Sequence, residues 1–106
     1  MNWAAFAIDA LKDGQEAQMR PRGNSMAGRV ESGDLVKLKP AKPEDLQVGD
    51  IVLVRVNGKV YLHLIKAKDG KGRFQIGNNK GRINGWVGPA AIYGKAVEVA
   101  GRALKS

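Results

Sequence analysis

The sequence predicts a mainly β protein, built as a folded-over antiparallel sheet or partly closed barrel with one short N-terminal helix. Residues 51–56 form a nearly continuous apolar, β-branched run, which is typical of a buried strand. Asn57 and Gly58 follow directly, and this pair is the strongest hairpin signal in the chain. Further short apolar runs are separated by glycine-containing turns. Hairpin-linked strands pair antiparallel, and folding such a sheet over buries both faces and protects its edges.

The length and composition fit one compact domain. The chain has 106 residues, of which 43% are apolar and 26% are charged, as in ordinary globular proteins. The absence of cysteine excludes disulfides, thiolate catalysis and cysteine-ligated metals. His63 is the single histidine, which argues against a histidine metal cluster. We therefore expect neither a metal nor a cofactor.

Hydropathy and the N-terminal residues bear on location. The sequence contains no run of about 18 apolar residues, the length that a membrane-spanning helix needs. The first residues lack the basic start and long apolar block of a secretory signal. We therefore expect a cytoplasmic protein with no membrane span.

The formal net charge of +8 is unevenly spread. Residues 1–54 carry seven basic and eight acidic groups, whereas residues 55–82 carry eight basic groups and only Asp69. We call residues 55–82 the basic segment. It is a candidate surface for nucleic acid, anionic lipid or an acidic protein, and equally a solubilising face of exposed lysines. Its candidate binding residues are Lys66, Lys68, Lys71, Arg73, Lys80 and Arg82.

Residues 2–12 are predicted to form an amphipathic helix. Its apolar residues recur at the spacing of one helical face: Trp3, Phe6, Ala7, Ala10 and Leu11. Gly14 is a plausible stop. Because eleven residues are too few for a stable isolated helix, this helix must dock on its own domain or on a partner.

The other elements follow in order. The predicted strands are residues 35–38, 51–56, 59–66, 73–76 and 92–99. The predicted loops are residues 40–45 and 77–81. Two stretches are predicted to be irregular: the polar residues 15–24 and the short segment 83–89. Gly-Asp precedes an apolar strand twice, at Gly33–Asp34 and Gly49–Asp50. We expect each aspartate to accept hydrogen bonds from backbone amides where its strand begins.

The stretch Arg22–Met26, with the sequence Arg-Gly-Asn-Ser-Met, is the candidate site. Gly23 and Asn24 tolerate a tight backbone with positive φ. Such a turn presents the Ser25 hydroxyl together with the backbone amides of Asn24 and Ser25. A serine nucleophile needs amides of this kind to stabilise the oxyanion. The alternative reading of Gly-Asn-Ser is an ordinary surface turn.

The order of motifs carries a resemblance. Along the chain stand Gly-Asn-Ser25-Met, Gly-Asp-Leu-Val, Val-Gly-Asp-Ile-Val, a hairpin strand with His63, Gly-Asn-Asn and Tyr-Gly-Lys-Ala-Val. This ordered set resembles the superfamily of signal peptidases and LexA-type self-cleaving repressors over about residues 20–99. The resemblance divides the chain into a helix and linker at 1–18, a peptidase-like domain at 19–100 and a tail at 101–106, which we expect to fray.

The resemblance implies roles for individual residues. Ser25 matches the nucleophile, and Tyr61–Ile65 resembles the segment that supplies a histidine base, here His63. Gly77-Asn78-Asn79 stands where members of the histidine type often have Gly-Asp-Asn, so Asn78 is the candidate for orienting the imidazole. An amide does not stabilise imidazolium as a carboxylate does, so we expect a slow enzyme. Lys66 is a rival base, but its odd spacing from His63 places it on the opposite strand face.

The chain also departs from the superfamily pattern. Ala27-Gly28 stands where signal peptidases commonly have a proline two residues after the nucleophile. The membrane anchor of signal peptidases and the DNA-binding domain of the repressors are not expected here. Ala27-Gly28 looks like the dipeptide that the repressors cut in themselves, but it lies too close to Ser25 to fold back into the site.

Two functions are therefore expected as alternatives. The first is a small soluble serine endopeptidase that cleaves a specific protein or peptide with a Ser25–His63 dyad. The second is a non-catalytic module of the same fold that binds nucleic acid or a protein through the basic segment. The resemblance also implies a homodimer built through the sheet, with the C-terminal strand as its seam.

Overall fold

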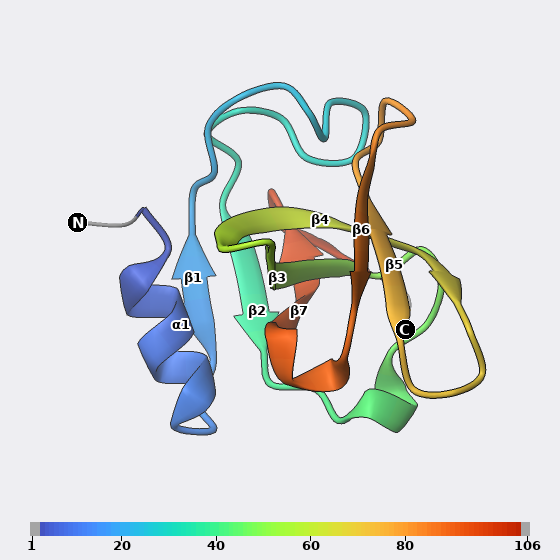
Figure 1. Ribbon diagram of the computed structural model, residues 1–106. Helices are drawn as coiled ribbons and strands as arrows, with labels where there is room; N and C mark the ends of the chain where they lie inside the picture. Colours follow the sequence, from blue (N-terminus) through green and yellow to red (C-terminus); the bar gives the residue numbers. More distant parts are fainter. Residues whose placement is uncertain (1–2, 105–106) are drawn as a thin grey trace.

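The structure is a computed structural model that describes residues 3–104. One helix and eight strands are found in these residues (Figure 1). They are α1 (Ala5–Lys12), β1 (Ala17–Met19), β2 (Val36–Lys39), β3 (Ile51–Val56), β4 (Lys59–Lys68), β5 (Phe74–Gly77), β6 (Ile83–Val87), β7 (Ile92–Val99) and β8 (Arg102–Ala103). Two single 3₁₀ turns, Pro43–Asp45 and Pro89–Ala91, precede β3 and β7.

The strands form one antiparallel sheet in the order β1-β2-β7-β3-β4-β5-β6, and β8 pairs with β7. The two ends of this order, β1 and β6, do not pair with each other, so the sheet is not closed. Register shifts in the β2–β7, β3–β7, β4–β5 and β5–β6 pairs bend the strands. The prediction of a mainly β, folded-over antiparallel sheet is confirmed.

The β3–β4 hairpin forms as its turn sequence predicts. Val56 pairs with Lys59 across a two-residue turn. Asn57 and Gly58 have φ values of 49° and 82°, and a type I′ turn requires positive φ at both positions. This turn fixes the register that aligns His63 of β4 with Val52 of β3.

Two hydrophobic clusters lie on opposite faces of β3. Ile51 and Leu53 belong to the cluster under α1, whereas Val52, Val54 and Val56 belong to the other, which also contains Phe74. Successive strand residues point to opposite faces, so a strand is buried throughout only when both faces are covered. Each such side chain stabilises the fold by about 1.5–3 kcal/mol.

Helix α1 packs on its own domain, with a face that only partly matches the predicted one. Ala4, Ala7, Ile8 and Leu11 are buried, whereas Trp3 and Phe6 are 54% and 80% exposed. Of the predicted face, Ala7 and Leu11 are confirmed and Ala10 is half-buried, whereas Trp3 and Phe6 are wrong, because Ile8 and small side chains pack on the sheet in their place. The predicted start at residue 2 lies outside the described residues. No helix in residues 3–104 is long and apolar enough to span a membrane.

Three strands were not predicted. The three residues of β1 pair with β2 at the sheet edge, where burial imposes no alternating pattern. Strand β6 lies within residues 83–89, which were predicted to be irregular. It contains Gly85 with a φ of 145°. Strand β8 pairs with Glu98 and Val99, so residues 102–103 are not a frayed tail.

Strand β7 lies inside the sheet. It pairs with β2, β3 and β8. Among residues 3–104, β1, β6 and β8 each pair with one strand only. The predicted homodimer with a C-terminal seam stays a prediction.

The two Gly-Asp sequences form the same local turn. The carboxylate of Asp34 accepts the amide of Glu31, and that of Asp50 accepts the amide of Gln47, both at 2.8 Å. In each case the aspartate amide donates back to the carbonyl of the same residue. The prediction that both aspartates accept hydrogen bonds from backbone amides is confirmed.

Candidate active site

Ser25 lies in the long loop between β1 and β2. Within this loop the Gly23 amide donates to Ser32 Oγ at 3.2 Å, and the Gly28 amide donates to a Glu31 carboxylate oxygen at 2.7 Å. Gly23 has a φ of 110°, which side chains with a Cβ rarely adopt. These bonds hold the Ser25 turn in a defined shape without a helix or strand at this position.

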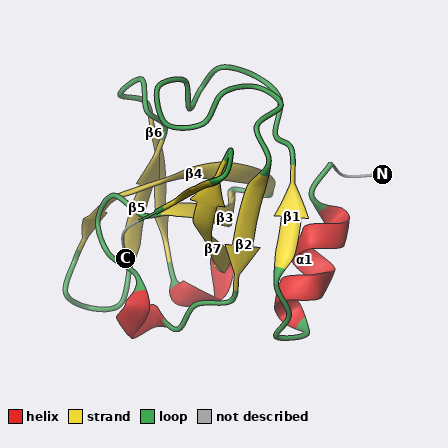
Figure 2. Cartoon of the chain, turned by 180° about the vertical axis from the view of Figure 1, so that it is seen from behind, coloured by secondary structure: helices red, strands yellow, loops and turns green. Residues whose placement is uncertain are grey.

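Asn79 joins the Ser25 turn to the loop between β5 and β6. Its backbone amide donates to the Ser25 carbonyl at 3.1 Å, and its Nδ2 donates to the Ala27 carbonyl at 2.8 Å. Arg29 Nε in turn donates to Asn79 Oδ1 at 3.1 Å. Both views of the chain show these two loops meeting at one end of the sheet (Figures 1 and 2). Asn79 therefore couples the position of Ser25 to the sheet.

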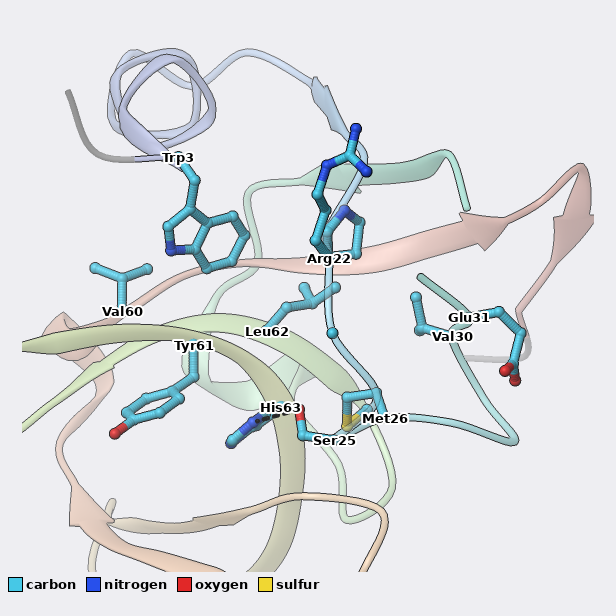
Figure 3. A pocket seen from close by; sticks show the side chains of 12 residues that line it. Trp3, Arg22, Ser25, Met26, Val30, Glu31, Val60, Tyr61, Leu62 and His63 are labelled. Carbon is cyan, nitrogen blue, oxygen red and sulfur yellow. Dashed lines mark hydrogen bonds between the residues drawn. The ribbon is translucent and has the colours of Figure 1, made fainter. Parts of the chain in front are cut away.

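His63 of β4 faces Ser25. Its Nε2 lies 3.3 Å from Ser25 Oγ, and the histidine is only 6% exposed (Figure 3). The two residues are 38 positions apart in the sequence. A serine hydroxyl at this distance from an imidazole nitrogen is arranged for proton transfer to a general base.

The other imidazole nitrogen is bonded to Asn84 of β6. The distance between His63 Nδ1 and Asn84 Oδ1 is 2.6 Å. Because Oδ1 accepts only, Nδ1 carries the proton. Nε2 is then left unprotonated and accepts the hydrogen of the Ser25 hydroxyl. The amide thus selects the tautomer that a base at Nε2 requires.

Asn78 does not orient the imidazole, so that prediction is corrected. Its Oδ1 accepts the amides of Lys80 at 2.9 Å and Arg82 at 3.0 Å. The side chain is therefore occupied in shaping the loop that leads into β6. The residue that reaches His63 comes six positions later, because β6 folds over to contact β3.

Tyr61 stacks on His63. The ring centroids are 4.7 Å apart and the planes are inclined by 28°. Residues two apart on a strand share a face, so the pair follows directly from the sequence spacing. Tyr61 shields one side of the imidazole and limits its rotation.

The pKa of His63 lies below 6.5. Burial is the largest cause, the hydrogen bond to Asn84 opposes it, and the positive charge of Arg82 lowers the pKa further. Burial and a nearby cation both disfavour the imidazolium form. His63 is therefore neutral at pH 7 and able to accept a proton.

The backbone amides predicted to stabilise an oxyanion are those of Asn24 and Ser25. Neither amide finds an acceptor among residues 3–104. Both are in the turn that carries the Ser25 hydroxyl, and the Asn24 carbonyl accepts the Ala27 amide at 3.1 Å. Unpaired amides beside a serine are the type of donor that receives developing negative charge.

Several residues of the basic segment have structural partners. Lys66 Nζ donates to the Asn78 carbonyl at 3.1 Å. The amine of this rival base is therefore bonded to the β5–β6 loop and not to Ser25. Lys68 Nζ donates to the Leu46 carbonyl, and Arg73 pairs with Asp69 at 2.9 Å. Lys71, Lys80 and Arg82 are exposed. Lys68 and Arg73 are exposed as well, so their contacts do not remove them from the surface.

A cleft of about 190 Å³ opens beside Ser25 and His63, and we call it the Ser25 cleft (Figure 3). Its other lining residues are Trp3, Pro21, Arg22, Gly23, Met26, Val30, Glu31, Val60, Tyr61 and Leu62. Ser25 and His63 stand at one end of a hollow that has both polar and apolar lining residues. Because Ser25 and His63 line this cleft, a group bound in it would lie beside the Ser25 hydroxyl.

The sequence predicted that Ser25 and His63 act together, but it did not predict three residues that hold the pair in position. Tyr61 could have been found from its spacing to His63, and Asn79 from its place beside Asn78. Asn84 carried no comparable signal, because it lies in the stretch taken as irregular. Had residues 83–87 been predicted as a strand, Asn84 would have been noticed as an amide, a residue type that is rare in strands.

Comparison with known proteins adds a family match. Residues 5–102 match the model of a family described as Peptidase S24-like. No curated protein matches the chain. The matched residues extend from the start of α1 into β8 and include Ser25, His63 and Asn84.

Proposed function

The chain belongs to the Peptidase S24-like family, and we propose that it is a serine endopeptidase that cleaves a specific protein with Ser25 as nucleophile and His63 as base. The observation that carries this proposal is the chain of contacts from Ser25 Oγ to His63 Nε2 at 3.3 Å and from His63 Nδ1 to Asn84 Oδ1 at 2.6 Å. Nucleophile, base and orienting group are the three parts that activate a serine.

In the proposed reaction Ser25 Oγ attacks the carbonyl carbon of the scissile peptide bond and its proton moves to His63 Nε2. The backbone amides of the turn stabilise the oxyanion. As the C–N bond breaks, His63 gives the proton to the leaving amine, and an acyl-serine ester remains. Water then attacks the ester and gives a proton to His63, after which the carboxylic acid leaves and Ser25 recovers its hydrogen.

Asn84 sets the character of this dyad. Its Oδ1 holds the Nδ1–H tautomer, so Nε2 is available at neutral pH. A neutral amide does not stabilise imidazolium as a carboxylate does. The proposed enzyme is therefore slow.

Cleavage acts in trans in this proposal. Ala27-Gly28 follows Ser25 by only two residues, and the Ala27 carbonyl is bonded to Asn79 Nδ2 at 2.8 Å. This bond is therefore a poor site for self-cleavage, and the proposal places the substrate on another chain.

The test is cleavage of a peptide mixture of known sequence, with new termini identified by mass spectrometry. We expect defined sites that disappear in both Ser25→Ala and His63→Ala. The matched control is Lys66→Met, which removes the rival base and should retain cleavage at the same sites. Cleavage that survives either alanine substitution would rule out the dyad.

A second candidate function rests on the charge of the basic segment. Lys71, Lys80 and Arg82 are exposed and available to phosphates. Three phosphate contacts would give a slope of about −2.7 for log affinity against log salt, since each contributes roughly −0.9. Binding of a DNA duplex that is insensitive to salt, or that survives K71A/K80A/R82A, would exclude this function.

A further inference from the structure

Trp3 occupies an unusual place for a large apolar residue. It is 54% exposed and contributes to neither hydrophobic cluster, although α1 behind it is packed on the sheet. It lines the Ser25 cleft, where its indole stands over Val60 and Leu62 (Figure 3). Phe6, in the first turn of α1, is 80% exposed but lies outside the cleft lining. Trp3, two residues before the start of α1, is thus an exposed aromatic side chain that faces the candidate active site.

The floor of this part of the cleft is apolar. Leu62, Met26 and Val30 are buried beneath it, and Val60 is half-buried at its side. A substrate side chain placed between the indole and these residues would be removed from water and would contact carbon atoms on several sides. Burial of this kind favours an aliphatic or aromatic group.

The charged residues of the cleft do not point into it. The Glu31 carboxylate is bonded to the Gly28 amide at 2.7 Å. Figure 3 shows the Arg22 guanidinium directed away from Ser25. A charged substrate side chain would therefore lose water without gaining a partner, which disfavours it.

The volume indicates how much of a substrate fits. The cleft measures about 190 Å³. Pockets that hold whole drug-sized molecules are larger, about 300–1,000 Å³. A protein cavity of about 150 Å³ is known to accommodate benzene. The Ser25 cleft therefore has room for one ring-sized side chain.

We infer that Trp3, Val60 and Leu62 form a subsite for one large apolar side chain, such as phenylalanine or leucine, of an extended protein substrate close to its scissile bond. This inference rests on the proposed peptidase function. It assigns Trp3 as a specificity-determining residue. Because Ser25 and His63 line the same small cleft, the side chain in the subsite belongs to a residue near the attacked carbonyl.

The inference is tested with two capped tripeptide amides, acetyl-Ala-Phe-Ala-amide and acetyl-Ala-Ala-Ala-amide. The first readout is the indole N–H signal of Trp3 in the Ser25→Ala variant, with the signal of Trp86 as internal reference. The second is protection of wild-type Ser25 from a small fluorophosphonate, measured by intact mass. The variants are Trp3→Ala and, as a matched control at an exposed aromatic residue three positions later, Phe6→Ala.

We expect the Phe peptide to shift the Trp3 signal and to protect Ser25 at about tenfold lower concentration than the Ala peptide, a typical discrimination for an apolar pocket. Trp3→Ala should abolish this preference and Phe6→Ala should keep it. Equal effects of both peptides, a shift confined to Trp86, or an unchanged preference in Trp3→Ala would overturn the subsite. If the fluorophosphonate leaves Ser25 unlabelled, the dyad fails, while the indole signals still decide on the subsite.

Discussion

Asn84 Oδ1 lies 2.6 Å from Nδ1 of His63, although the strands that carry the two residues do not pair with each other. Strand β5 separates β4 from β6 in the sheet order, and β6 reaches the imidazole because the sheet folds over. The fold itself therefore supplies the group that fixes the tautomer of His63.

Replacing Asn84 tests this relationship. Asn84→Leu keeps the approximate size of the side chain but removes the acceptor for Nδ1–H. We expect labelling of Ser25 by a fluorophosphonate to slow by about 100-fold, because the imidazole loses its fixed tautomer. Asn84→Asp should instead raise the pKa of His63, since a carboxylate favours imidazolium. Labelling at the wild-type rate in Asn84→Leu would contradict the assigned role.

The pH dependence of labelling follows from the pKa of His63. Burial and Arg82 lower this pKa below 6.5, so the neutral base is fully present at pH 7 and is lost as the pH falls through the lowered value. The labelling rate should therefore rise to a plateau with a midpoint below 6.5. Arg82→Gln removes a positive charge and should move the midpoint upward. A midpoint above 6.5 in the wild type, or a downward shift in the variant, would refute this explanation.

Asn79→Ala removes the side-chain bonds that join the Ser25 turn to the β5–β6 loop. The Ala27 carbonyl loses its donor, and we expect a loss of about 1–3 kcal/mol in the free energy of unfolding. The labelling rate should fall while the pH midpoint stays unchanged, because Asn79 does not touch His63. The control is Gln47→Ala, whose exposed side chain makes no bond among the described residues. A changed midpoint would mean that Asn79 acts on the base instead.

Gly94 permits the close contact between α1 and β7. A Cβ at this position would lie 2.7 Å from the Lys39 carbonyl oxygen and 2.8 Å from a Leu11 methyl group. Gly94→Ala should therefore lower the free energy of unfolding by about 1–3 kcal/mol, the usual cost of overpacking. Gly88→Ala is the matched control, since no atom lies within 4 Å of its Cβ position and its φ is −84°. Equal unfolding midpoints for the two variants would contradict this packing.

Much of the sheet could be predicted because its signals are local. The run Ile51–Val56 and the Asn57–Gly58 turn specify one hairpin without reference to the rest of the chain. The same holds for the aspartates of the two Gly-Asp turns, whose partners lie three residues away. Ser25 and His63 were found from the order of motifs rather than from physical pattern.

The remaining features depend on contacts between distant segments. Asn84 and Asn78 are both amides near the same loop, and only the bending of β6 decides which one reaches His63. In α1 both Phe6 and Ile8 are apolar enough to lie in the packed face. The helix approaches β7 closely at Gly94, and in this position Ile8 and Leu11 are the residues that become buried. Sequence periodicity alone does not contain this information.

The central claim, that His63 activates Ser25, is tested most directly by the rate of fluorophosphonate labelling at about pH 7.5, where an unperturbed histidine is mostly neutral. Intact mass of the wild type should show one adduct, and peptide mapping should place it on Ser25. The rate should fall by about 100-fold or more in folded His63→Ala, as expected for loss of a general base. A folded wild-type protein that stays unlabelled, or a His63→Ala variant that labels at the wild-type rate, would contradict the claim.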